Sequence, residues 1–180
     1  WTLLSDSSWK GYSDLSHRLM EGYTVFMAEA ERQISAPSHI FLQAGVGGLA
    51  GAAAAMARKT WGEAPVIVVV EPCHAPALLG CIQAGDFIAA TGPGSAMGRL
   101  DCLEASLIAL KGLAKDADVF ALISEEEGQA GANYAAAHQM ESTPSGAAGL
   151  AGLLASPAHR TALKLDANSH ALVILSEGPE

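Results

Sequence analysis

A glycine-rich stretch, FLQAGVGGLAGAAAA at residues 41–55, constrains the fold of this chain more than any other feature. It follows an apolar run at residues 40–42 and leads into residues 50–56, which favour a helix. Glycine destabilises regular elements, so this concentration of glycines indicates a backbone that another group must approach closely. A loop between a strand and a helix directs its free N–H groups and the positive end of the helix dipole at one point. The stretch therefore predicts a phosphate-binding loop.

The loop differs from two common phosphate-binding motifs. No Gly-Lys-Ser/Thr sequence follows, which argues against a P-loop. The dinucleotide motif G-x-G-x-x-G, read from Gly45, places Ala50 at the third glycine. It also requires an acidic residue about 20 positions further on, and Glu71 is too distant to serve. Close packing of a helix on a strand remains the structural alternative, but the position of the paired glycines between strand and helix favours a phosphate loop.

The composition excludes several classes of partner. The chain has 180 residues, enough for one sizeable core, and half of them are hydrophobic. A formal net charge of −9 without clusters of Lys and Arg argues against a nucleic-acid partner. An acidic surface also suits anionic lipid poorly, and no apolar run reaches the roughly 20 residues that span a bilayer.

The cysteines and the chain ends support two further expectations. Cys73, Cys81 and Cys102 are odd in number and lack C-x-x-C spacing, which favours reduced thiols in a cytoplasmic protein. The chain starts at Trp1 rather than at methionine, and it ends directly after an apolar run. We therefore expect it to be part of a larger protein.

The order of apolar patterns predicts alternating strands and helices. We expect strands at residues 1–4, 39–42, 66–70, 119–123 and 171–175. We expect helices at residues 15–33, 50–60, 75–84 and 101–114, from Ser124 to about 139, and from about 144 onward. The unbroken apolar run at residues 66–70 is typical of a central parallel strand that is covered on both faces. The pattern predicts an α/β fold with three layers around a largely parallel sheet.

Several blocks of sequence, taken together, resemble the C-terminal half of the diaminopropionate ammonia-lyase family. In chain order they are SDSSWKGY, MEGYTVFMAEA, PSHIFLQAGVGGLAG, VIVVVEP, ESTPSGAAGL and ALVILSEG. The family consists of pyridoxal-phosphate enzymes of fold type II, the tryptophan synthase β-subunit fold. The resemblance implies that residues 1–36 form the end of a small domain and a connecting helix. It implies that residues 37–180 form the C-terminal part of a larger cofactor-binding domain.

The resemblance also implies roles for individual residues. The cofactor phosphate would be held by the backbone of Gly45, Val46, Gly47, Gly48 and Leu49. Ser176 would hydrogen-bond to the pyridine nitrogen, and Asp6 would be the base that takes the α-proton of the substrate. Glu141 would lie near the cofactor ring. Position alone would suggest only a solvated serine at a strand end for Ser176 and a turn cap for Asp6.

The chain departs from the family pattern in its lysines and in a possible metal site. The family holds its cofactor as a Schiff base on a lysine of the N-terminal half. The lysines of this chain lie in other sequence contexts: Lys10, Lys59, Lys111, Lys115 and Lys164. Relatives such as serine racemase bind a divalent ion through a Glu-Pro glutamate and an aspartate six residues later. Glu71-Pro72 is present here, but Ala77 stands at that later position, so we expect no metal by this route.

The implied activity is β-elimination from 2,3-diaminopropionate to pyruvate and ammonia, with pyridoxal 5′-phosphate as cofactor. We expect the chain alone to be inactive, to need an N-terminal half of the same enzyme, and to assemble as a homodimer. A serine/threonine dehydratase-like lyase of the same fold is an alternative. A non-catalytic α/β module that binds a phosphate group is another.

Overall fold

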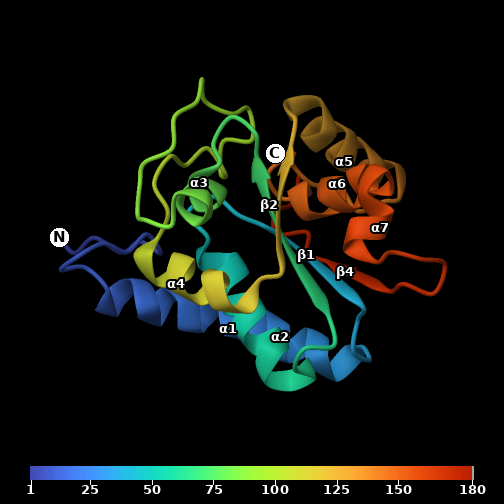
Figure 1. Cartoon of the computed structure of the whole chain (residues 1–180), viewed down its shortest axis with the longest axis horizontal. Coiled ribbons are helices and arrows are strands. Elements are labelled where there is room, and N and C mark those ends of the chain that lie inside the picture. The colour runs from blue at the N-terminus through green and yellow to red at the C-terminus, as the bar shows by residue number, and fades with distance from the viewer. Residues whose placement is uncertain (180) are drawn as a thin grey trace.

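The computed structural model of the chain describes residues 1–179, and its centre is a four-stranded sheet. The strands are β1 (His39–Gln43), β2 (Val66–Pro72), β3 (Val119–Ile123) and β4 (Ala171–Val173). They lie in the order β3-β2-β1-β4, and every pairing is parallel (Figure 1). The predicted α/β fold with a parallel sheet is therefore confirmed.

The two central strands are buried almost throughout, which explains their unbroken apolar sequences. Alternate side chains enter opposite layers: Ile40 and Leu42 join one core, whereas Phe41 joins the other. Since all strands run in the same direction, their carboxyl ends meet at one edge of the sheet. The glycine loop follows β1 at that edge, and Ser176 follows β4 there.

Helices cover both faces of the sheet (Figure 1). One layer contains α2 (Gly48–Trp61), α3 (Ala77–Ala84) and α4 (Leu107–Asp116), with α1 (Asp14–Gln33) packed on α2. The other layer contains α6 (Ala148–Ala155), with α5 (Glu125–Ala137) packed on it, followed by η1 (Ser156–His159) and α7 (Arg160–Leu163). The alanines and glycines of α2 and α6 bring helix and strand backbones close together.

Two expected elements differ from the structure. No strand forms at residues 1–4, because this segment has no neighbouring strand and Trp1, Leu3 and Leu4 are exposed. The helix expected at residues 101–114 begins only at Leu107. The preceding residues bind other segments instead: Asp101 accepts a hydrogen bond from the N–H of Ser95, and the Ser106 hydroxyl donates to the carbonyl of Asp6.

Within residues 1–179, no helix has the length and apolar character that a membrane crossing requires.

Candidate functional site

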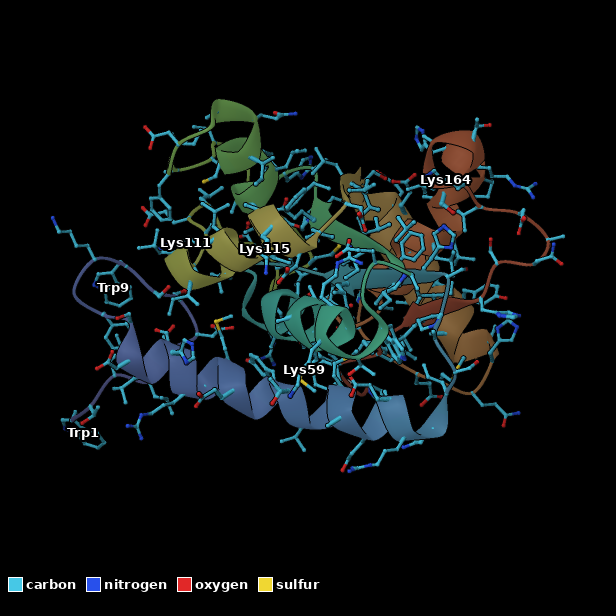
Figure 2. All side chains as sticks on the ribbon, turned by 60° about the horizontal axis from the view of Figure 1, so that its bottom comes forward. Trp1, Trp9, Lys59, Lys111, Lys115 and Lys164 are labelled. Carbon is cyan, nitrogen blue, oxygen red and sulfur yellow. The ribbon has the colours of Figure 1, made fainter. Side chains whose placement is uncertain are left out.

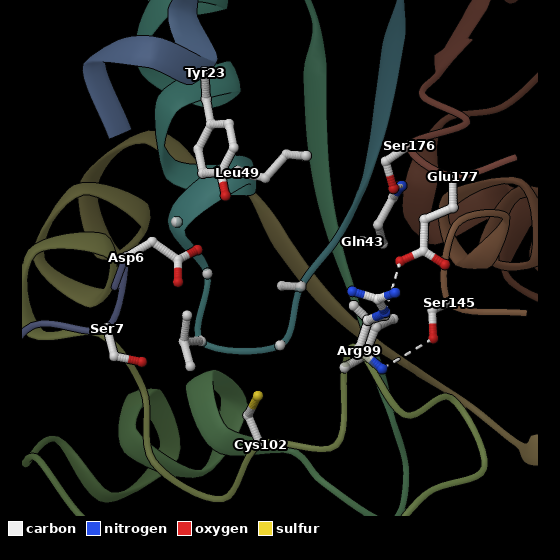
Figure 3. A pocket seen from close by; sticks show the side chains of 16 residues that line it. Asp6, Ser7, Tyr23, Gln43, Leu49, Arg99, Cys102, Ser145, Ser176 and Glu177 are labelled. Atoms are coloured by element: carbon white, nitrogen blue, oxygen red, sulfur yellow. Dashed lines mark hydrogen bonds and ion pairs between the residues drawn. The ribbon is translucent and has the colours of Figure 1, made fainter. Parts of the chain in front are cut away.

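A cavity of about 450 Å³ opens at the carboxyl edge of the sheet (Figure 3). Its walls come from the N-terminal segment, α1, the loop between β1 and α2, the irregular segment before α4, the turn before α6, and the segment after β4. The side chains labelled in Figure 3 are Asp6, Ser7, Tyr23, Gln43, Leu49, Arg99, Cys102, Ser145, Ser176 and Glu177. Segments far apart in sequence thus converge on one point, as expected at this edge of a parallel sheet.

The glycine loop forms the floor of the cavity, and its geometry requires glycine at several positions. Gly47 caps α2 with φ of 97°, a left-handed conformation. A Cβ on Gly45 would lie 3.0 Å from the carbonyl oxygen of Arg99 and 3.1 Å from the Cα of Leu100. A Cβ on Gly48 would lie 2.5 Å from the Asp6 carboxylate. The loop backbone is therefore packed too closely for side chains at these positions.

The N–H groups at the start of α2 are free to bind an anion. The first N–H groups of a helix have no acceptor within the helix. Within residues 1–179 the structure records no other acceptor for the N–H groups of Gly47, Gly48 and Leu49. The positive end of the α2 dipole lies at the same point. A dianionic phosphate fits this donor set, and the Asp6 carboxylate beside Gly48 bounds the space on one side.

Asp6 lies beside this loop and faces Tyr23 of α1. The hydroxyl of Ser106 donates to the Asp6 carbonyl over 2.8 Å, which fixes the backbone of the N-terminal segment against α4. The pKa of Tyr23 is raised, first by burial and then by the charge of Asp6 and a hydrogen bond to it. Asp6 thus lies within the cavity, between the glycine loop and a phenol that stays protonated.

Ser176 lies on the opposite wall, where Gln43 fixes it. The Gln43 amide nitrogen lies 2.9 Å from the Ser176 hydroxyl oxygen. The same nitrogen donates to the carbonyls of Gly146 and Ile174, each over 3.0 Å. Gln43 therefore joins the end of β1 to the turn before α6 and to the segment after β4.

Glu177 and Arg99 narrow the cavity next to Ser176. One oxygen of the Glu177 carboxylate accepts a hydrogen bond from Thr143, and the other lies 3.6 Å from the Arg99 guanidinium. The N–H of Arg99 donates to the buried Ser145 hydroxyl over 3.2 Å. Arg99 is the cationic side chain that lines the cavity within the described part of the chain.

The structure brings Asp6, the loop from Gly45 to Leu49, and Ser176 to one cavity. Glu141 is exposed and does not line it, although Glu177 does. Sequence reasoning also missed Tyr23, Gln43, Arg99 and Cys102. Gln43 could have been found, because it is a polar residue that ends a buried strand directly before the loop.

Cys102 is a half-buried thiol beside Gly45, in the segment that precedes α4. Burial is the main cause that raises the pKa of this thiol, and the N–H of Val46 opposes the rise by donating a hydrogen bond to the sulfur. The thiol therefore remains protonated near neutral pH. It occupies space against the glycine loop rather than supplying a charge to it.

The lysines lie outside the cavity. All five are exposed: Lys10, Lys59, Lys111, Lys115 and Lys164. Figure 2 labels the last four of them. Among residues 1–179, no lysine lines the site. Within residues 1–179, this cavity has donors for a phosphate and a polar side chain for a ring nitrogen, but no amine. The residues present thus fit the phosphate and ring of pyridoxal phosphate without providing its covalent anchor.

The carboxylate of Glu71 is hydrogen-bonded within the protein rather than directed at the cavity. It is fully buried, and its two oxygens accept hydrogen bonds from the N–H groups of Leu78 (2.7 Å) and Leu79 (2.8 Å) at the start of α3. Burial raises its pKa to about 7 despite these two bonds. Among residues 1–179, no cluster of three or more His, Cys, Asp or Glu side chains could hold a metal ion.

Comparison with known proteins identifies relatives of this chain. The diaminopropionate ammonia-lyase of Salmonella typhimurium is 38% identical over 84 residues, which are 43% of this chain and 21% of that protein. The crystal structure of the Escherichia coli diaminopropionate ammonia-lyase, in complex with an aminoacrylate-PLP azomethine reaction intermediate, superimposes with a TM-score of 0.89 at 26% identity. That match covers 99% of this chain and 49% of the E. coli chain, so this chain spans about half of that relative.

A more distant structure shares the fold. The threonine deaminase of T.th. superimposes with a TM-score of 0.75 at 21% identity, over 90% of this chain and 57% of that chain. These matches confirm the fold type II architecture. The family model described as "Pyridoxal-phosphate dependent enzyme" matches residues 7–177. The chain therefore belongs to the pyridoxal-phosphate dependent enzyme family.

Proposed function

We propose that this chain forms the phosphate-binding and ring-binding part of a pyridoxal-phosphate-dependent ammonia-lyase. The enzyme would eliminate the β-amino group of 2,3-diaminopropionate and release pyruvate and ammonia. The observation that carries the proposal is the convergence of the bare glycine loop, Asp6 and Ser176 on one cavity. The resemblance of nearly the whole chain to the E. coli enzyme supports this choice of substrate.

The glycine loop would bind the phosphate through its backbone. The free N–H groups and the dipole of α2 offer several charge-assisted hydrogen bonds, which are stronger than bonds between neutral groups. Since Gly45 and Gly48 carry no Cβ, residues 99–102 and Asp6 pack directly against the loop, which leaves the N–H groups at the start of α2 to bind the phosphate. This binding fixes one end of the cofactor at the carboxyl edge of the sheet.

Ser176 would hold the other end, at the ring nitrogen. Pyridoxal phosphate supplies an electron sink for the carbon that loses its proton. A hydroxyl is too weak an acid to protonate a pyridine nitrogen, so Ser176 leaves that nitrogen neutral and moderates the electron sink. This suits loss of a β-substituent more than chemistry that needs a long-lived carbanion.

Asp6 would take the α-proton. Its carboxylate lies against the start of α2, close to the place where the phosphate would bind. The Tyr23 phenol stays protonated, so it can donate to the carboxylate and orient one oxygen into the cavity. A positioned carboxylate is a suitable general base for this step.

The lysine that forms the Schiff base would come from a segment outside this chain. We propose that an N-terminal half of the same enzyme supplies it, and that the complete enzyme is a cytoplasmic homodimer. In that enzyme, residues 1–36 would form the end of a small domain and its connecting helix. Residues 37–180 would form the C-terminal part of the larger cofactor-binding domain. Exposed apolar side chains such as Trp1, Leu4 and Trp9 in the N-terminal segment leave surface for such contacts.

The ratio of products tests the proposed reaction. The enzyme that carries this chain together with its lysine should release twice as much ammonia as pyruvate from 2,3-diaminopropionate. Equal amounts of ammonia and pyruvate from serine, with no turnover of diaminopropionate, would support a dehydratase instead. No turnover of either substrate by a cofactor-loaded protein would support a non-catalytic module.

Substitution of Asp6 tests its role as the base. Asp6→Asn preserves the shape of the side chain but cannot accept a proton, so we expect kcat to fall by about 10²–10⁴-fold. The matched control is Asp14→Asn, at an exposed position at the start of α1, which should leave kcat unchanged. Equal activity of the two variants would exclude Asp6 as the base.

A further inference from the structure

Gln43 is a buried side chain whose amide nitrogen has more acceptors than it has hydrogens. It is 3% exposed and ends β1, directly before the glycine loop. The nitrogen lies within 3.0 Å of three oxygens: the carbonyls of Gly146 and Ile174 and the hydroxyl of Ser176. The other amide atom, Oε1, is buried without a hydrogen-bond partner among residues 1–179.

The two carbonyls determine which way this amide points. Carbonyl oxygens only accept hydrogen bonds, so they must face the NH₂ group and not the amide oxygen. A rotated amide would place Oε1 against both carbonyls. The orientation is retained although it leaves Oε1 buried without a hydrogen bond, which is unfavourable for an amide oxygen. The amide is also closely packed, because a Cβ on Gly149 would lie only 2.8 Å from Oε1.

The orientation of the amide in turn determines the direction of the Ser176 hydroxyl. An amide nitrogen has no lone pair available to accept, so Ser176 must present its oxygen to Gln43 and direct its hydrogen elsewhere. Within residues 1–179 no acceptor is recorded for that hydrogen, and Ser176 is exposed to the cavity. The hydroxyl is therefore available as a donor into the cavity.

We propose that Gln43 is a positioning residue that makes Ser176 a hydrogen-bond donor toward the cofactor ring. An unprotonated pyridine nitrogen accepts one hydrogen bond and donates none, so it needs such a donor. Gln43 acts through Ser176 and does not touch the ring itself. This inference rests on the proposed function, which places the ring nitrogen opposite Ser176.

The test uses the complete enzyme loaded with pyridoxal phosphate that carries ¹⁵N in its ring. In Gln43→Met, a side chain of similar length without a donor, the Ser176 hydroxyl is free to donate to the Gly146 or Ile174 carbonyl. The ring nitrogen then loses its hydrogen bond, and its ¹⁵N signal should move downfield to the value measured in Ser176→Ala. The double variant should show no further shift. Gln33→Met, at an exposed position at the end of α1, should leave the signal unchanged.

The outcomes separate this inference from the proposed function. If Ser176→Ala leaves the nitrogen signal unchanged, Ser176 does not face the ring, and the proposed assignment fails. If Ser176→Ala moves the signal but Gln43→Met does not, Gln43 is only structural, and this inference is overturned. A merely structural Gln43 would lower stability and cofactor retention without moving the nitrogen signal.

A second measurement requires no change at Gln43. The side-chain NH₂ protons of Gln43 should move upfield in Ser176→Ala, because the amide loses one acceptor while it keeps its two carbonyl bonds. This shift should appear with and without cofactor, and the variant should keep its thermal stability within a few degrees. Unchanged NH₂ protons would mean that Gln43 does not donate to Ser176, which contradicts the inference.

Discussion

Contacts with individual neighbouring atoms explain why the loop has glycines at Gly45 and Gly48. The hypothetical Cβ of Gly45 would contact backbone atoms of Arg99 and Leu100, which cannot rotate away as a side-chain end could. Gly47 has a backbone conformation that side chains disfavour, and Gly48 lies against Asp6. The loop and the residues that oppose it are therefore fitted to each other before any ligand binds.

We expect Gly45→Ala to damage this site specifically. The new methyl group must push residues 99–102 or the loop itself, and the lost phosphate bonds should weaken cofactor affinity by about 10–100-fold. The matched control is Gly80→Ala in α3, where the nearest atom would be the Ala90 methyl at 3.9 Å. It should keep full affinity in an equilibrium titration. Equal affinity of both variants would show that the loop does not hold the phosphate.

Glu71 predicts a pH dependence of stability. Its folded-state pKa of about 7 lies above the ordinary value of 4.5, so the folded protein binds this proton more tightly than the unfolded chain does. The free energy of unfolding should therefore fall as the pH rises from about 4.5 to about 7. Each pKa unit corresponds to about 1.4 kcal/mol, which limits the fall to about 3 kcal/mol.

Glu71→Gln isolates this effect, because the amide does not titrate. Denaturant unfolding at several pH values should show the decline in the parent protein and a flatter curve in the variant. At low pH the parent carboxyl is protonated and, like the amide, offers one carbonyl oxygen to the two N–H groups of α3, so the two proteins should differ least in stability there. Parallel curves for the two proteins would contradict a raised pKa.

At the scale of elements, small residues set the distances between helices. Gly131 of α5 faces Ala151 of α6 so closely that a Cβ would lie 2.7 Å from the Ala151 methyl and 3.1 Å from its backbone nitrogen. Helix α6 in turn lies on β2, where Gly152 meets Val70. The same helix follows the turn that holds Ser145 and Gly146, so its depth on the sheet positions one wall of the cavity.

Gly131→Ala should therefore destabilise the fold although alanine is the better helix former. The overlap with α6 should cost about 1–3 kcal/mol, more than the roughly 1 kcal/mol that alanine gains in a helix. Gly112→Ala in α4, with nothing within 4 Å of its new methyl, should stabilise by about 0.5–1 kcal/mol. Thermal unfolding of the two variants measures this difference, and a stabilising Gly131→Ala would disprove the close contact.

At the scale of the whole molecule, the sequence predicts the sheet better than the site. The apolar runs of β1 and β2 and the helix start at Ser124 are local signals, and the structure confirms them, adding a capping box between Ser124 and Glu127. The cavity instead depends on contacts between distant segments, such as Asp6 with Gly48. Arg99 and Cys102 come from an irregular stretch without periodicity, so no local pattern could place them.

Glu141 and Glu177 also show that local sequence patterns cannot place the side chains of the cavity. Glu141 and Glu177 both flank turns near the carboxyl edge, and sequence alone does not show which one turns inward. In the structure Glu177 is held in the cavity wall by Thr143 and Arg99, whereas Glu141 is exposed. Which glutamate enters the cavity wall depends on Thr143 and Arg99, which are distant from Glu177 in the sequence.

A crystal structure of the complete enzyme with bound pyridoxal phosphate tests the central claim most directly. We expect phosphate oxygens within about 3 Å of the backbone nitrogens of the Gly45–Leu49 loop. We also expect the ring nitrogen within hydrogen-bond distance of the Ser176 hydroxyl. A phosphate bound elsewhere, or a ring nitrogen far from Ser176, would contradict this claim.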